Sequence, residues 1–133
     1  IELNATLNLS KLVKPLGNDY YLSLFPCRIP LITIPSNRKL PVKLPFPICN
    51  SDTLIYSIPV GYELKNKSDT ISIKTKYGNY ELKLSTINDK IYAIKHFELY
   101  PASYSTEQYP EFYSFIKSVN EIDRMNLILR RQQ

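Results

Sequence analysis

The side chains best suited to chemistry in this sequence are two cysteines, Cys27 and Cys49, and the single histidine, His96. A cysteine nucleophile needs a base within hydrogen-bond reach, and the base needs a third group to orient it. Activated cysteines usually open a helix or lie beside positive charge, whereas both of these lie in proline-rich, extended chain. We therefore predict no catalytic residues and no enzyme activity. A cysteine-dependent enzyme would need one cysteine beside His96, and the sequence leaves open whether the two form a disulfide.

Metal and cofactor sites find little support in the residue types or their spacing. The histidine and the cysteines lack the close pairs of ligands that zinc sites show. Asp52, Asp69 and Asp89 fall at expected turns, where aspartate is favoured for its local hydrogen bonds. The chain has three glycines and no phosphate-binding loop. We predict no cofactor and no bound metal.

Tyrosine is the one residue type whose abundance suggests binding. The chain has 11 tyrosines, 5 phenylalanines and no tryptophan. Tyrosines that stand exposed together can stack on sugars or grip a peptide. The candidates for such a surface are Tyr20, Tyr21, Tyr77, Tyr80 and Tyr92. The competing interpretation is that these rings pair across strands and fill the core.

The net charge of +5 does not indicate a nucleic-acid partner. A nucleic-acid binder gathers its basic residues on one helix or stripe, whereas lysines are spread here along alternating segments, where we expect them on solvent faces. No apolar run approaches the roughly 18 residues that a membrane span needs. The first residues have the character of a strand rather than of a signal peptide, so we expect a mature or excised piece of a longer protein.

Hydrophobic spacing predicts a mostly β-stranded chain. Period-two alternation predicts strands at 1–10, 20–25, 52–58, 62–64, 71–73, 80–84, 91–99 and 125–130, and residues 40–46 also alternate. Turn clusters at 15–19, 66–69, 77–79 and 88–89 are too short for parallel crossovers and predict consecutive antiparallel hairpins. The proline-rich stretch 26–47 predicts an edge strand or a connection that crosses between sheets.

One segment breaks this period. Apolar residues three and four apart predict an amphipathic helix from about 109 to 122, and Ser105 with Gln108 resembles a capping box before it. We predict one domain over residues 1–133, an all-β, immunoglobulin-like antiparallel β-sandwich of about seven or eight strands. The helix would cover an open end or edge of the sandwich through Phe112, Phe115, Ile116 and Val119.

Two stretches carry a family resemblance. The first is Arg38-Lys39-Leu40-Pro41-Val42, followed by Asp52, Leu54, Tyr56 and Ile58-Pro59-Val60-Gly61-Tyr62-Glu63-Leu64. The second is Tyr109-Pro110-Glu111-Phe112-Tyr113-Ser114-Phe115, then Asp123 and Leu127-Ile128-Leu129. Together they resemble the uncharacterised C-terminal domain of transglutaminase-like proteins that certain Gram-negative bacteria export. The likeness covers about residues 30–133, and this chain lacks the proline that often follows the Gly-Tyr pair.

The resemblance implies a β-sandwich that follows a papain-like catalytic region and works in the periplasm or another exported location. The family's catalytic cysteine, histidine and aspartate belong to that other region, so none carries over. We expect structural roles for Pro59, Gly61 and Tyr62 at a strand end, and for Arg38 in fixing the crossing chain. The predicted function is an accessory domain that packs on or spaces a neighbouring domain. The alternative is a glycan- or peptide-binding module that uses surface tyrosines or an open strand edge.

Overall fold

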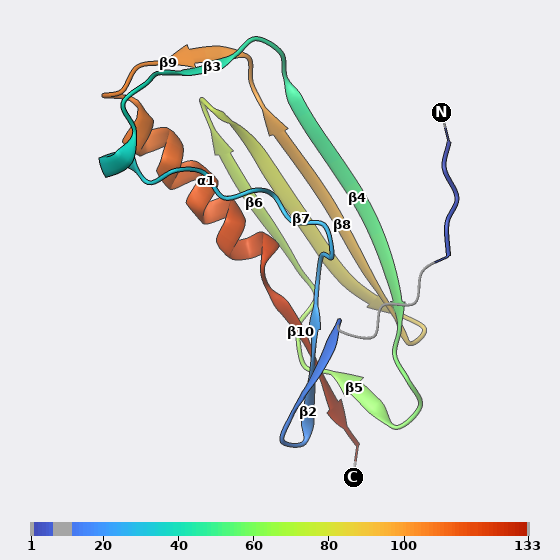
Figure 1. The fold of residues 1–133 in the computed structure, drawn as a ribbon. Coiled ribbons are helices and arrows are strands. Elements are labelled where there is room, and N and C mark those ends of the chain that lie inside the picture. The colour runs from blue at the N-terminus through green and yellow to red at the C-terminus, as the bar shows by residue number, and fades with distance from the viewer. Residues whose placement is uncertain (1, 7–11, 133) are drawn as a thin grey trace.

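The computed structural model describes residues 2–6 and 12–132, which form ten strands, one α-helix and one short 3-10 helix (Figure 1). The strands are β1 (Val13–Leu16), β2 (Asp19–Ser23), β3 (Val42–Leu44), β4 (Ile48–Ser57), β5 (Tyr62–Leu64), β6 (Asp69–Thr75), β7 (Gly78–Ile87), β8 (Lys90–Leu99), β9 (Ala102–Tyr104) and β10 (Asn126–Arg131). The 3-10 helix is η1 (Pro35–Asn37), and the α-helix is α1 (Tyr109–Asp123). The antiparallel, all-β, sandwich-like class predicted from the sequence is confirmed.

The main sheet has the order β4-β8-β7-β6, and every neighbouring pair in it is antiparallel. Its hairpins follow directly from the sequence. Ile87 pairs with Lys90, so Asn88 and Asp89 alone make the turn between β7 and β8. Their φ angles of 48° and 57° are those of the two-residue turn that suits a twisted hairpin, and asparagine and aspartate adopt them more easily than most residues.

The helix α1 lies across one face of the main sheet, and the chain from 24 to 34, which leads into η1, runs beside it (Figure 1). The rings of Phe115 and Phe97 stack between the helix and β8 with centroids 6.5 Å apart. The predicted capping box is confirmed, because the Ser105 amide donates to Gln108 Oε1 and the Gln108 amide donates back to Ser105 Oγ. The helix was expected at an end or edge of the sandwich; instead its apolar stripe covers the sheet face.

Two smaller sheets close the ends of this layered body. A four-stranded sheet of order β1-β2-β10-β5 forms the lower end in Figure 1, and β3 pairs with β9 at the upper end. In the lower sheet Leu22 pairs with Leu127, so a strand from the first part of the chain lies beside the last strand. We call this lower sheet the tip sheet.

Several local predictions need correction. The strand predicted over residues 1–10 is wrong for residues 2–6, which have no strand and lie exposed; residues 7–11 lie outside the described residues. A short strand, β1, precedes the turn at Gly17 where only a turn was expected. The alternation over 40–46 yields just the three residues of β3, and Phe46 stays 75% exposed, because only that stretch finds a partner strand.

Candidate functional site

The five candidate tyrosines do not form one exposed surface, so that prediction is corrected. Tyr77 and Tyr80 are buried in the core, with exposed fractions of 1% and 0%. Tyr20 packs edge-on against Tyr62 in the tip sheet, Tyr21 is half-buried next to it on β2, and Tyr92 is half-buried on β8. Alternation alone could not tell which face of each strand would be buried, and the tertiary structure buries Tyr77 and Tyr80.

The residues that were expected to have structural roles make contacts within the fold. Arg38 donates to the carbonyl oxygens of Leu40 and Pro41, and its guanidinium lies 4.8 Å from the centre of the Tyr109 ring. These contacts fasten the crossing chain to the start of α1.

The turn before β5 and the helix stripe also take the expected form. Gly61 has a φ of 82°, which a side chain disfavours, and the Tyr62 amide donates to the Pro59 carbonyl across that turn. Phe112 and Phe115 are buried between the helix and the main sheet.

The groups with chemical potential are scattered. Cys27 and Cys49 are free and exposed. His96 Nδ1 lies 2.8 Å from Ser51 Oγ, on the solvent face of the main sheet, where the two residues are paired across β4 and β8. A nucleophile and a base are therefore adjacent, but they stand on an open sheet face rather than in a cleft that excludes water.

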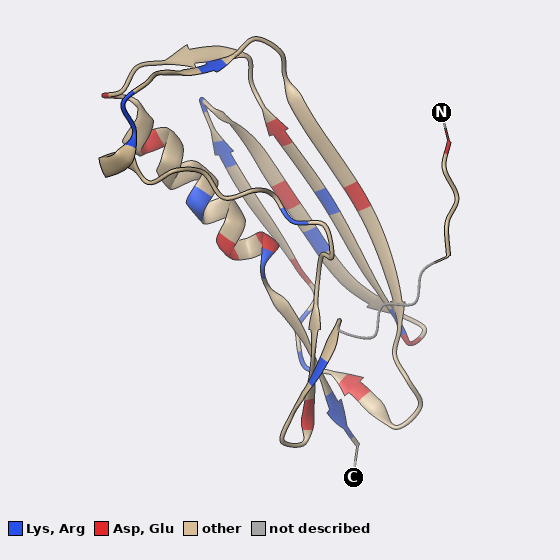
Figure 2. Ribbon diagram, in the orientation of Figure 1, with Lys and Arg blue, Asp and Glu red and all other residues tan. Residues whose placement is uncertain are grey.

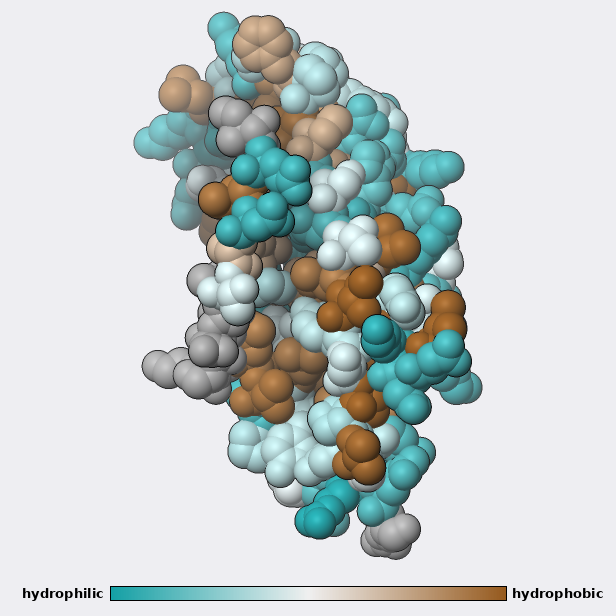
Figure 3. Space-filling model, turned by 90° about the vertical axis from the view of Figure 1, so that its right-hand side faces the viewer, coloured by the Kyte–Doolittle hydropathy of each residue, from teal (hydrophilic) through white to brown (hydrophobic). Residues whose placement is uncertain are grey.

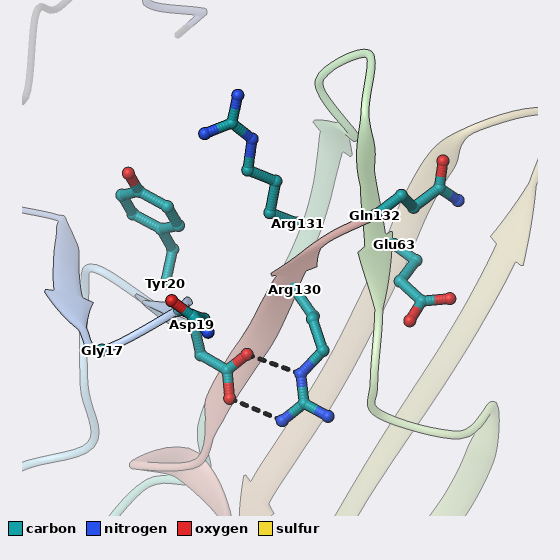
Figure 4. Close-up of a pocket in the computed structure, with 8 residues that line it drawn as sticks. Gly17, Asp19, Tyr20, Glu63, Arg130, Arg131 and Gln132 are labelled. Atoms are coloured by element: carbon teal, nitrogen blue, oxygen red, sulfur yellow. Dashed lines mark hydrogen bonds and ion pairs between the residues drawn. The ribbon is translucent and has the colours of Figure 1, made fainter.

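A pocket of about 810 Å³ opens in the tip sheet (Figure 4). The β1–β2 turn, β5 and the end of β10 line it with Gly17, Asn18, Asp19, Tyr20, Glu63, Arg130, Arg131 and Gln132. Arg130 donates two hydrogen bonds to Asp19, from Nε at 2.7 Å and from the terminal nitrogen at 2.8 Å, as the dashed lines show. This forked pair joins β2 to β10 and gives the pocket a polar, charged wall.

Electrostatics at this pocket follow from the pair. The hydrogen bonds and the positive charge of Arg130 lower the pKa of Asp19 from its ordinary value of 3.8, so its carboxylate stays charged at neutral pH. Arg131 extends on the same side as Tyr20 (Figure 4). Such a wall suits contact with a polar surface of a neighbouring protein segment.

A buried ionic cluster was missed by the sequence reasoning. Lys95, expected on a solvent face, has an exposed fraction of 1%. Its Nζ lies 2.9 Å from Asp52 Oδ2 and 3.0 Å from Asp123 Oδ1, and Asp123 is itself fully buried. The signal was available, because Lys95 shares one face of its strand with four residues that all lie in the core: Ile91, Ala93, Phe97 and Leu99. We call Lys95, Asp52 and Asp123 the ionic cluster.

Charges outside this cluster are mixed in sign. Figure 2 shows lysines and arginines interspersed with acidic residues along the strands rather than gathered in one basic stripe. Figure 3, which looks onto the side where β4 runs, shows hydrophobic side chains scattered among polar ones. Exposed apolar residues on the main sheet include Ile55 and Ile94.

Among residues 2–6 and 12–132, no group of three or more histidine, cysteine or acidic side chains is placed to hold a metal ion. Within the same ranges no helix combines the length and the apolar character that crossing a membrane requires.

Comparisons with known proteins place the chain among uncharacterised domains. A family model described as a domain of unknown function with a solved structure, DUF3858, matches residues 18–129. The chain also resembles the crystal structure of a protein from Parabacteroides distasonis described as a "putative protease", with a TM-score of 0.62 and 18% identity. That likeness covers 78% of this chain but 23% of the other, so it concerns the fold of one part of a longer protein. No curated protein matches the chain.

Proposed function

This chain belongs to the DUF3858 family, and we propose that it is a non-catalytic accessory domain of a longer, transglutaminase-like exported bacterial protein, in which it packs on or spaces a neighbouring domain. The observation that carries the proposal is the proportion of the structural match: this fold makes up 23% of the longer chain that it resembles. A domain that is a minor part of a larger chain usually contacts its neighbours over a moderate, partly polar interface.

The tip sheet is the surface that we assign to this contact. Its pocket has charged walls, and two strongly exposed apolar side chains belong to the same end of the molecule, Leu16 on β1 and Val60 in the turn before β5. An apolar contact rimmed by charges is the usual composition of an interface between domains. The outer face of the main sheet, with its scattered charges, is the matched comparison surface.

Hydrogen exchange tests this assignment. We expect the amides of the β1–β2 turn and β5 to exchange more slowly in the parent protein than in the isolated chain, while exposed positions of the β7–β8 turn exchange equally in both. Equal exchange at the tip sheet in both proteins would remove the proposed docking surface. A parent gene that encodes no neighbouring domain would remove the accessory role altogether.

The non-catalytic and exported parts of the proposal have separate tests. Both exposed cysteines should be labelled by iodoacetamide without loss of the parent's activity, and serine at either position should leave that activity unchanged. Loss of activity on labelling and in a serine variant would show a catalytic cysteine. Cell fractionation should find the parent in the periplasmic or secreted fraction, and a cytoplasmic parent contradicts the proposed location.

A second candidate function is the binding of an extended peptide, and the open side of β4 favours it. Within the described residues no strand pairs with that side. The Ile58 amide donates to Asp89, so by antiparallel alternation the even-numbered residues of β4 bond β8, while Ser51, Thr53 and Ile55 direct their backbone groups outward. The segment from Ile48 to Ser57 also lacks the lysines and prolines that protect many edges.

Substitution of Thr53 separates the two candidates. Thr53→Lys should abolish peptide capture at this edge and leave the docking of the tip sheet intact. Lys83→Arg, on the exposed face of β7, serves as the control. Unchanged peptide binding by Thr53→Lys would exclude the β4 edge.

A further inference from the structure

We propose that the ionic cluster is a site of covalent modification, at which the Lys95 side chain and the Asp123 carboxyl group condense into an intramolecular isopeptide bond. The bond would join the centre of β8 to the last residue of α1. It is independent of the accessory role, because it concerns the interior of the domain.

The geometry brings the two reacting groups together. Lys95 Nζ lies 3.0 Å from Asp123 Oδ1, a hydrogen-bond distance that holds Nζ beside the carboxyl group whose carbon it would attack. Lys95 is 1% exposed and Asp123 is fully buried, and the Phe25 ring centre lies 4.2 Å from Nζ. Burial of both groups keeps out the water that would reverse the condensation.

Donors surround the carboxyl group of Asp123. The Ile29 amide donates to Oδ2 at 2.8 Å, and the Tyr80 hydroxyl lies 3.4 Å from Oδ1. Burial raises the pKa of Tyr80 far above its ordinary value, so this hydroxyl stays protonated and remains a donor. Fixed donors at a carboxyl oxygen stabilise the negative charge that develops there when a nucleophile adds to the carbon.

Asp52 is positioned to carry the proton. Its Oδ2 lies 2.9 Å from Lys95 Nζ, and its side chain is 31% exposed at the β4 edge. The side chains of Lys95 and Asp123, in contrast, are buried. The Nζ lone pair adds to Cγ of the protonated Asp123, Asp52 takes a proton from Nζ, and the proton passes to the departing hydroxyl. One C–N bond forms, one C–O bond breaks, and one water leaves; no oxidant or reductant is needed.

Mass spectrometry under denaturing conditions gives the decisive measurement, because an ion pair does not survive denaturation and an amide does. We expect the wild-type mass to be lower than the sequence mass by one water, and a tryptic digest to give a branched peptide that joins Lys95 to Asp123 with no cleavage after Lys95. An unmodified wild-type mass overturns the proposal. So does a loss of water that peptide mapping places elsewhere.

Variants identify the chemistry. Asp123→Asn should lose ammonia instead of water and reach the same product mass as the wild type. Lys95→Arg should keep its full sequence mass, and the control Lys83→Arg, on an exposed position of β7, should lose water as the wild type does. Asp52→Asn, altered at the partly exposed member, should fold and stay unlinked. A fully cross-linked Asp52→Asn removes Asp52 from the mechanism.

Discussion

Replacing Phe115 by alanine tests whether the helix stripe and the main sheet share one core. Phe115 is 4% exposed, and its ring stacks on both Phe97 and Tyr77 with centroids 6.5 Å away in each case. The substitution removes an aromatic side chain and leaves a cavity that rigid neighbours on the sheet fill only in part. We expect a loss of about 3–5 kcal/mol in the free energy of unfolding.

The assay is equilibrium unfolding in urea, with the slope checked for two-state behaviour. Phe46→Ala is the matched control, because it deletes the same ring from a site that is 75% exposed, and it should change the free energy of unfolding by less than about 0.5 kcal/mol. A loss below about 1 kcal/mol for Phe115→Ala, with an unchanged slope, would refute the packing of α1 on the sheet face.

Three further predictions concern charge and close packing. Lys95→Met should cost about 3–5 kcal/mol, measured by urea unfolding, because it leaves the Asp123 carboxyl group buried without the Lys95 nitrogen that it contacts; a neutral effect would contradict this. The pKa of Asp19, followed by NMR, should lie below 3.8 and return towards 3.8 in Arg130→Gln. Because the pKa of Asp19 is lower in the folded than in the unfolded protein, the stabilisation is present above the unfolded pKa and is lost as the pH falls through the folded pKa. Gly78→Ala should lower the thermal midpoint and reduce the free energy of unfolding by about 1–3 kcal/mol or more, because a Cβ there would meet a backbone oxygen of β8 at 2.0 Å. An unchanged midpoint would contradict this close approach.

The local elements of this domain could be predicted because side-chain spacing and turn chemistry are local properties. Alternation placed β7 and β8, the Asn88-Asp89 turn joined them, and spacings of three and four placed α1. The all-β class and the capping box followed from the same patterns.

Tertiary structure alone decided which residues meet. The pairing of β2 with β10, on which the tip pocket depends, joins segments from opposite ends of the chain, and no local period records such a partner. The burial of Lys95 depends on the position of Asp123, which lies beside it at the end of α1. A lysine is buried only where another element supplies a polar partner for its nitrogen. Tyr77 and Tyr80 became core residues for a related reason. The helix covers the side of the main sheet on which they lie, and the sequence places aromatic side chains on both sides.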